Sequence, residues 1–241
     1  MKLDVLFMGA HPDDVELGCG GTVHKLVKKG YKVGIADLTR GELGTRGTEE
    51  IRAQEAKDAA EILGVAVRDN CGISDGHIEI NRENKIKVIE MIRKYAPDLM
   101  IIPYWSDRHP DHANASKLIK ECIYYAGTEK WPVNTPTSVL PAHRPKNYFY
   151  YMLAEPFEPN IIVDITEEKE VRIKAFQAFK SQFHVPGHVS NEKETWISKP
   201  EFAESLTARI GFYGFLIGTR YAEPFFSEKP LRIDDLMMFG K

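Results

Sequence analysis

The chain has 241 residues, 43% of them hydrophobic, and a formal net charge of −3 at pH 7. This length and apolar content are enough for one large hydrophobic core, so we expect a single domain over residues 1–241. The weak net charge provides no broad positive field for nucleic acid or an anionic membrane, and a small molecule is therefore the expected partner.

The three cysteines, Cys19, Cys71 and Cys122, are widely spaced and form no Cys-x-x-Cys pair. This spacing favours neither a disulfide framework nor a thiolate zinc site. The first residues show no signal-peptide cleavage pattern, and no apolar segment has the length of a membrane span. We expect a cytoplasmic protein that binds neither membrane nor nucleic acid.

Apolar segments of strand length alternate with amphipathic segments of helix length through the first half of the chain. The four expected strands cover residues 3–8, 32–38, 65–68 and 99–103. The helices between them are expected over about residues 14–30, 49–63 and 82–95, the second capped by Thr48 and the third by Asn81. Such alternation is typical of a mostly parallel sheet covered by helices on both faces, a Rossmann-like three-layer α/β sandwich.

The second half has a weaker pattern. A helix is expected from about residue 112 to 125, followed by a long Pro-rich loop over 131–145. Two further strands, 148–153 and 161–165, precede a helix that Thr166 caps and that reaches about residue 179. We expect roughly the last sixty residues to form loops and short helices that build a lid or close the core.

Two short segments are rich in metal-ligand side chains, one after the first expected strand and one after the fourth. They are Gly9-Ala10-His11-Pro12-Asp13-Asp14 and Asp107-Arg108-His109-Pro110-Asp111-His112. In a doubly wound sheet ordered 3-2-1-4-5, strands one and four are neighbours, and ligands bind outside their carboxyl ends. We therefore expect the two segments to face each other across one site.

Two imidazoles and one carboxylate with an open coordination position are typical of a catalytic zinc site. His11 and Asp14 lie three residues apart across a strand-to-helix turn, where both side chains can converge on one ion. His112 from the other segment would complete the set. Zn²⁺ is the expected cofactor, although Fe²⁺ accepts the same ligands.

Asp13 and His109 lie beside these ligands and are not needed to bind the ion. Because zinc lowers the pKa of bound water to about 7, Asp13 is expected to accept the remaining proton as general base. Protonated His109 is expected to stabilise the oxyanion or to protonate the leaving amine, with Asp111 holding it in its charged form. Together these residues predict a metal-dependent amidohydrolase.

The motifs resemble those of the zinc-dependent PIG-L/LmbE deacetylases. The matching residues are His11-Pro12-Asp13-Asp14, Glu16-x-Gly18-x-Gly20-Gly21-Thr22 and His109-Pro110-Asp111-His112. The resemblance implies deacetylation of an N-acetylglucosamine conjugate, with the ligands, base and transition-state histidine at the positions given above. Residues 39–48 and 106–108 look like the bacillithiol-pathway branch, which implies N-acetylglucosaminyl-malate as substrate. Family members also assemble as hexamers or trimers, so a homo-oligomer is expected.

Basic residues near the site suit such a substrate, because guanidinium groups bind the two carboxylates of malate well. The candidates are Arg46, Arg52 and Arg108. Arg52 belongs to the second expected helix, where pairing with Glu49 or Glu55 is an alternative.

Other functions stay open at this point. A different acetylated substrate such as diacetylchitobiose would leave the chemistry unchanged. Two histidines and a carboxylate also describe the site of non-haem iron oxygenases, and a Rossmann-like scaffold can be a non-catalytic sugar- or nucleotide-binding module. Gly18-Cys19-Gly20-Gly21, with Asp37 some twenty residues later, weakly resembles a dinucleotide motif, but close helix packing explains these glycines better.

Overall fold

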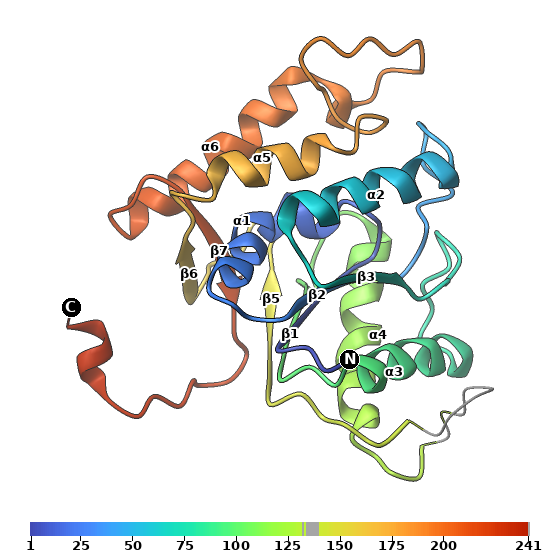
Figure 1. Cartoon of the computed structure of the whole chain (residues 1–241), viewed down its shortest axis with the longest axis vertical. Coiled ribbons are helices and arrows are strands. Elements are labelled where there is room, and N and C mark those ends of the chain that lie inside the picture. The colour runs from blue at the N-terminus through green and yellow to red at the C-terminus, as the bar shows by residue number, and fades with distance from the viewer. Residues whose placement is uncertain (132, 134–139, 241) are drawn as a thin grey trace.

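The computed structural model describes residues 1–131, 133 and 140–240 (Figure 1). The strands are β1 Val5–Gly9, β2 Val33–Asp37, β3 Val67–Asn70, β4 Leu99–Pro103, β5 Asn147–Tyr151, β6 Ile161–Asp164 and β7 Ala222–Phe226. The α-helices are α1 Asp14–Lys28, α2 Glu49–Leu63, α3 Arg82–Tyr95, α4 Pro110–Ala126, α5 Lys169–Gln177 and α6 Pro200–Leu216. Two short 3-10 helices are η1 Trp196–Ser198 and η2 Leu236–Phe239.

The strands form one mixed sheet in the order β3-β2-β1-β4-β5-β7-β6. The first five are parallel and keep the predicted order 3-2-1-4-5, while β7 is antiparallel to both β5 and β6. β1 lies at the switch point, with Val5 paired to Val33 of β2 and to Leu99 of β4. The predicted α/β class and mostly parallel sheet are confirmed, and the carboxyl ends of β1 and β4 lie side by side.

Helices cover both faces of the sheet, as expected (Figure 1). Side chains alternate across β1, so Leu6 and Met8 join the apolar core under α3 and α4. Val5 and Phe7 point the other way, into the core that includes residues of α1 and α5. Because both faces of this strand are buried, its sequence is a continuous apolar run rather than an alternating one.

The predicted caps of the second and third helices are confirmed. The side chain of Thr48 accepts from the backbone N–H of Ile51, and that of Asn81 accepts from Asn84. The third strand was placed two residues too early. The reason is the left-handed Gly64, since the N–H groups of Gly64 and Val65 both donate to the carbonyl of Ala60 and extend the helix cap into the expected strand.

The prediction that Thr166 caps a helix is wrong. Both its N–H and its hydroxyl donate to the carboxylate of Asp164 in a turn, and α5 begins only at Lys169. The last third was also predicted poorly, because it contains the 17-residue helix α6 and strand β7. Pro224 of β7 pairs with Ile162 of β6, and the ladder of β7 with β5 includes only Phe225 and Phe226, so this proline faces one partner strand.

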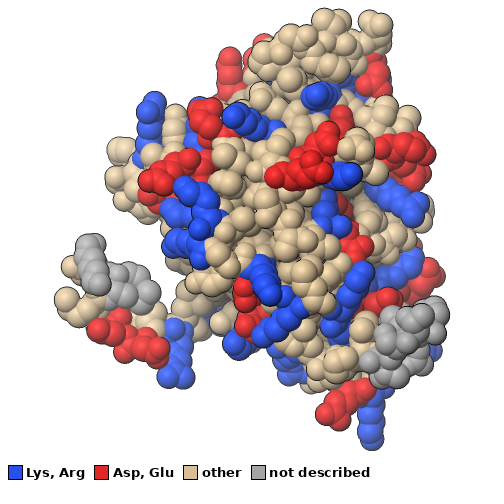
Figure 2. Space-filling model, in the orientation of Figure 1, with Lys and Arg blue, Asp and Glu red and all other residues tan. Residues whose placement is uncertain are grey.

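Part of the predicted Pro-rich loop over 131–145 lies outside the described residues, namely 132 and 134–139. On the face shown in Figure 2, basic and acidic side chains are interspersed, in line with the weak net charge. Among the described residues, no helix combines the length and the apolar character that crossing a membrane requires.

The glycines of α1 permit close packing, as the sequence indicated. A Cβ atom on Gly18 would lie 2.3 Å from the Tyr151 ring, whereas a Cβ on Gly20 would have its nearest neighbour at 3.6 Å. Asp37 does not take part in a dinucleotide site, because its carboxylate pairs with the guanidinium of Arg68.

These two glycines give a matched test of packing. Gly18→Ala should lower the free energy of unfolding by about 1–3 kcal/mol, because the added methyl group collides with a buried ring. Gly20→Ala has room and gains helix propensity, so its unfolding free energy should stay within about 1 kcal/mol of the parent. Denaturant unfolding of both variants measures the difference, and equal effects would contradict the packing account.

Candidate metal centre

The turn between β1 and α1 is closed by the carboxylate of Asp14. Its Oδ2 accepts from the backbone N–H groups of Ala10 (2.8 Å) and His11 (2.9 Å). Its Oδ1 lies 3.2 Å from Nε2 of His112, in the first turn of α4. One buried carboxylate therefore fixes its own turn and joins the two predicted segments.

Each of the two histidines is oriented by a second carboxylate. Nε2 of His11 lies 2.9 Å from Asp75 Oδ1, and Nδ1 of His112 lies 3.0 Å from Asp107 Oδ1. The other ring nitrogen of each histidine faces Asp14. Metal-binding histidines are characteristically held in this way, with one nitrogen on a carboxylate and the other turned to the ion.

The donor set fits a metal ion. The ligand atoms of His11, Asp14 and His112 lie within 4.8 Å of one another, with Asp14 3.8 Å from His11 Nδ1 and 3.2 Å from His112 Nε2. A tetrahedral zinc site with ligands near 2.0–2.1 Å needs donor atoms about 3.3 Å apart, so small movements suffice. The three predicted ligands are thus brought together.

The electrostatics of the site also favour a cation. Burial lowers the pKa of His11, but hydrogen bonds to Asp111 and Asp75 raise it to about 10. Burial likewise lowers the pKa of His112, whereas the charge of Asp14 and the hydrogen bond to Asp107 raise it to about 9. The converging carboxylates therefore create a negative potential at the place where an ion would be held.

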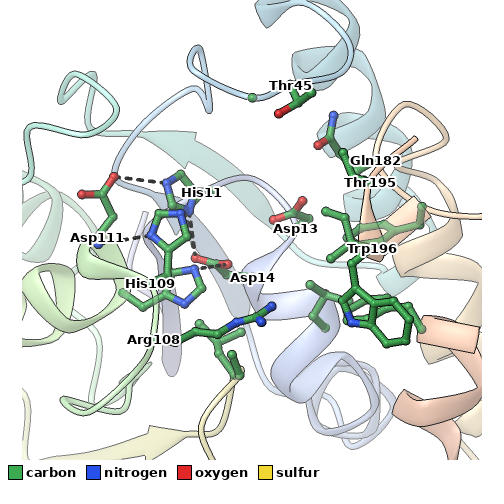
Figure 3. Close-up of a pocket in the computed structure, with 18 of the residues that line it drawn as sticks. His11, Asp13, Asp14, Thr45, Arg108, His109, Asp111, Gln182, Thr195 and Trp196 are labelled. Carbon is green, nitrogen blue, oxygen red and sulfur yellow. Dashed lines mark hydrogen bonds and ion pairs between the residues drawn. The ribbon is translucent and has the colours of Figure 1, made fainter. Parts of the chain in front are cut away.

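Asp13, the predicted base, is held in a strained position beside the ligands (Figure 3). Its backbone φ of 125° is one that non-glycine residues rarely adopt. Arg52 donates to its Oδ2 at 2.9 Å and also to the carbonyls of Pro12 and Gly41. Burial raises the pKa of Asp13 to about 7, although the charge of Arg52 opposes the shift. A carboxylate with such a pKa can accept and return a proton near neutral pH.

Arg52 therefore orients the predicted base, and its guanidinium does not form the ion pair with Glu49 or Glu55 that the sequence left open as an alternative. Glu55 instead accepts from the N–H and hydroxyl of Ser181. Since the contacts of Arg52 are to Asp13 and to backbone carbonyls, its predicted role in binding substrate carboxylates is not supported by this geometry.

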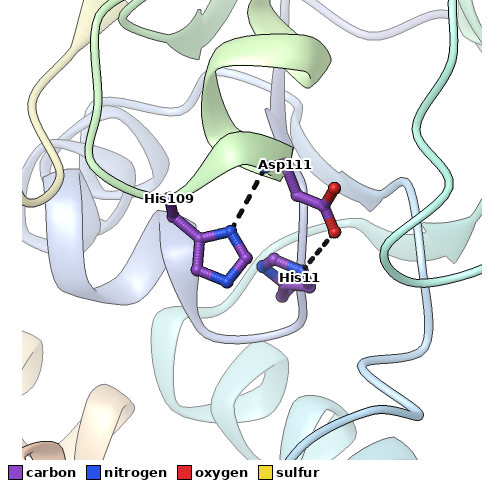
Figure 4. A group of neighbouring side chains, drawn as sticks. All are labelled: His11, His109 and Asp111. Carbon is purple, nitrogen blue, oxygen red and sulfur yellow. Dashed lines mark hydrogen bonds and ion pairs between the residues drawn. The ribbon is translucent and has the colours of Figure 1, made fainter.

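His109 caps the N-terminus of α4 (Figure 4). Its Nδ1 accepts from the backbone N–H of Asp111 at 3.2 Å, so the proton of the neutral ring belongs on Nε2. Burial and the neighbouring His112 and His11 lower the pKa of His109. The neutral ring is favoured, contrary to the prediction that Asp111 holds it charged.

The carboxylate of Asp111 has a different partner from the predicted one. It lies 3.4 Å from Nε2 of His11 and accepts from the N–H of Gly76 at 2.8 Å. His11, His109 and Asp111 form a second group with donor atoms close together. We favour the set with Asp14 for a geometric reason. In it, Nε2 of His11 and Nδ1 of His112 are held by Asp75 and Asp107, and the other ring nitrogen of each histidine faces Asp14 and can bind the ion.

The other two predicted arginines have different environments. Arg46 is buried, and its guanidinium donates to the carbonyls of Ser181 (2.6 Å) and Lys193 (3.0 Å), so it fastens the segment after α5. Arg108 is exposed at the pocket and makes no hydrogen bond or ion pair with the described residues. Of the three candidates, Arg108 has the guanidinium that an anionic group on a substrate can reach.

The metal centre opens into a cavity of about 730 Å³. One wall comes from the loops after β1 and β4, and the other comes from the last third of the chain, including Phe183, Trp196, Phe202 and Arg209. The sequence missed this wall and the carboxylate of Asp75. Asp75 lies in a Ser-Asp-Gly turn, which is an ordinary loop signal and gives no sign of a metal site.

Comparisons with known proteins identify a matching family model and similar chains. Residues 6–123 match the family model described as PIG-L, GlcNAc-PI de-N-acetylase. The chain is 31% identical to a diacetylchitobiose deacetylase from Thermococcus kodakarensis over 230 residues, which is 91% of this chain and 80% of that protein.

Two solved structures are also similar. The conserved protein TT1542 from Thermus thermophilus superposes with a TM-score of 0.85 at 35% identity, over 97% of this chain and 98% of its own. An N,N'-diacetylchitobiose deacetylase from Pyrococcus horikoshii superposes with a TM-score of 0.78 at 28% identity, over 92% of this chain and 82% of its own.

The supporting carboxylates generate a prediction about metal affinity. Asp75→Asn and Asp107→Asn keep the shape of each side chain but remove the charge behind His11 and His112. Each should weaken Zn²⁺ binding by about 10- to 100-fold. Competition with a chromophoric chelator measures the affinity, and Asp164→Asn, which touches only the Thr166 turn, is the control. Affinities equal to that of the control would refute the supporting role.

The strained backbone of Asp13 generates a second prediction. Asp13→Gly should give a free energy of unfolding about 1–2 kcal/mol higher than Asp13→Ala, because glycine adopts a positive φ without steric cost. Both variants lose the Arg52 ion pair equally, so their difference isolates the backbone. Denaturant unfolding of the two chains provides the measurement, and an alanine variant at least as stable as glycine would show that Asp13 is unstrained.

Proposed function

The chain belongs to the PIG-L family of deacetylases, and we propose that it hydrolyses the acetamide of an N-acetylglucosamine conjugate, releasing acetate and a free amine. The observation that carries this proposal is that Asp13 and His109 line the same cavity as His11, Asp14 and His112, the proposed ligand set. A proton acceptor, a hydrogen-bond donor and an open cation site are the groups that amide hydrolysis requires.

We propose Zn²⁺ as the resident ion, with Fe²⁺ as an alternative that the same ligands accept. When bound by these residues, the ion would polarise the acetamide carbonyl and make water a better nucleophile at neutral pH. The two imidazoles and the carboxylate leave coordination positions open for this purpose.

The side chains of the protein supply the proton transfers. Asp13, with Oδ2 fixed by Arg52, accepts a proton from the attacking water while the water oxygen bonds to the acetyl carbon. The Nε2–H of neutral His109 donates to the carbonyl oxygen as it gains negative charge. Asp13 then returns its proton to the nitrogen as the C–N bond breaks, which yields the free amine and acetic acid, and the acid loses its proton to become acetate at neutral pH.

The pocket favours a sugar beside the reacting acetamide. Trp196 is half exposed on the rim and Phe202 lies on the same wall, and aromatic rings of this kind stack on the apolar faces of sugars. The finer substrate is proposed to be a neutral saccharide such as diacetylchitobiose, the substrate named for two relatives. The sequence instead predicted N-acetylglucosaminyl-malate. Because Arg46 and Arg52 donate to groups of the protein, only Arg108 of the three predicted arginines is left to bind the malate carboxylates.

The rival functions use these groups less well. An iron oxygenase has no need for Asp13 and His109 as proton-transfer groups. A binding module gains nothing from a strained Asp13 whose pKa lies near neutrality. The hexamer or trimer and the cytoplasmic location expected from the sequence stay predictions.

Acetate release tests the proposal directly. The zinc-loaded protein should release acetate from diacetylchitobiose without consuming oxygen, and chelated protein should not. Asp13→Asn should lower kcat by about 10²- to 10⁴-fold and His109→Gln by about 10²- to 10³-fold, because each removes a group used in the transition state. Metal binding should persist in both variants, and His24→Gln, a histidine bonded to the Leu63 carbonyl, is the control.

The substrate panel separates the finer alternatives. N-acetylglucosaminyl-malate and N-acetylglucosamine are tested beside diacetylchitobiose at equal concentration. Faster turnover of the malate conjugate, lost in Arg108→Gln, would overturn the neutral saccharide and keep the deacetylase. Failure of all three substrates with metal-loaded protein would contradict the deacetylase proposal itself.

A further inference from the structure

Helix α1 is broken just after its first turn, which begins at the proposed ligand Asp14 and is called the metal-binding turn below. Cys19 has φ −155° and ψ 25°, which is not helical. In a regular helix the N–H of Gly21 would donate to the carbonyl of Leu17. Here the N–H groups of Gly21 and Thr22 donate instead to Oε1 (3.0 Å) and Oε2 (2.7 Å) of Glu223 on β7.

On the N-terminal side of the break, the carbonyl of Leu17 also accepts hydrogen bonds from side chains. Leu17 accepts from the guanidinium of Arg172 on α5 and, at 3.2 Å, from that of Arg209 on α6. Arg172 in turn donates from Nε to Glu223 Oε1 at 2.9 Å. An ion pair between α5 and β7 is therefore inserted into the hydrogen-bond ladder of α1.

Stability alone is a poor reason for this arrangement. The side chains of Arg172 and Glu223 are both 0% exposed, and buried ion pairs seldom stabilise a fold more than apolar residues of the same size would. Two arginines share one carbonyl, and NH1 of Arg172 has no partner among the described residues. Burial, and then repulsion from Arg172, lower the pKa of Arg209 to about 10.

The break lies directly after the turn whose orientation determines the positions of Asp13 and Asp14. The single turn before it begins at Asp14 and follows Asp13, so its axis sets where both carboxylates point. Leu17 and Arg209 also line the cavity, and Arg209 donates a further bond to the carbonyl of Leu153 on its wall. The guanidinium thus joins the metal-binding turn to the substrate wall.

We propose that Arg172, Arg209 and Glu223 are positioning residues for the metal-binding turn. By holding the freed carbonyl and N–H groups of α1, they fix the angle of its first turn and so place Asp13 and Asp14. The last third of the chain then contributes to the reaction without supplying a metal ligand. The turnover part of this inference rests on the proposed deacetylase, while the metal-affinity part does not.

Arg172→Lys is the sharpest variant, because Arg172 is fully buried and does not line the cavity. Lysine keeps the charge but lacks the planar fork that reaches Glu223 and the Leu17 carbonyl together. We expect kcat and Zn²⁺ affinity each to fall about 10- to 100-fold, with KM changed less than about threefold. Arg209→Lys should act in the same direction.

Arg93→Lys is the matched control. Arg93 is a buried arginine that also donates to backbone carbonyls, those of Ala126 (3.0 Å) and Thr128 (2.8 Å), on the opposite face of the sheet. Arg93→Lys should lower the free energy of unfolding about as much as Arg172→Lys does, while kcat and Zn²⁺ affinity stay at the parental values. Each variant is assayed at a temperature where unfolding curves show it to be folded.

The outcomes are distinct. If Arg172→Lys keeps parental kcat and metal affinity, or changes KM alone, the positioning role is overturned. If Arg172→Lys does not fold, Glu223→Gln is tested in its place, since it keeps one acceptor and removes the ion pair. If the parent chain shows no deacetylation, the proposed function fails, and the Zn²⁺ affinities of the same variants still decide the positioning role.

Discussion

The carboxylate of Asp14 is the constraint on which the rest of the site depends. Its Oδ2 satisfies two backbone N–H groups that the sharp turn after β1 would otherwise leave unpaired, and its Oδ1 reaches His112 in the first turn of α4. The contact with His112 is possible only because β1 and β4 are adjacent parallel strands whose carboxyl ends coincide. The sheet order is therefore a requirement of the chemistry, since strands farther apart would not bring these side chains within reach.

Around this carboxylate the buried charges form separate compensated groups. Arg52 balances Asp13, Arg68 balances Asp37 and Glu16, and Arg172 balances Glu223. Unpaired, each would carry a large desolvation cost. Several of these pairs join elements far apart in the chain, as Arg172 of α5 and Glu223 of β7 do with the backbone of α1. Charges that stabilise little by themselves therefore fix the relative positions of the elements that carry the site.

What the sequence predicted well was local or periodic. The strands and caps of the first hundred residues follow from apolar runs, Thr48, Asn81 and Gly64. The proximity of the three predicted ligands, whose ligand atoms lie within 4.8 Å of one another, follows from two dense motifs and the rule for the switch point. The roles of Arg46 and Arg52 were not predictable in the same way, because a guanidinium has the same sequence signature whether it meets a substrate or the carbonyl of a residue 135 positions away. Asp75 and Glu223 were missed for the same reason.

Two parts of the chain line the cavity and differ in chemistry. The turns after β1 and β4, with the first turns of α1 and α4, carry the proposed ligands and proton-transfer groups, whereas η1 and α6 line the opposite, apolar and aromatic wall. A wall of this kind can change shape, and with it the substrate, while the chemistry stays intact. The exception is Arg209, which belongs to the wall and also holds the carbonyl of Leu17 in the metal-binding helix. Substitutions around α6 that move this guanidinium would alter rate and specificity together, which ties the evolution of the substrate wall to the geometry of the metal-binding turn.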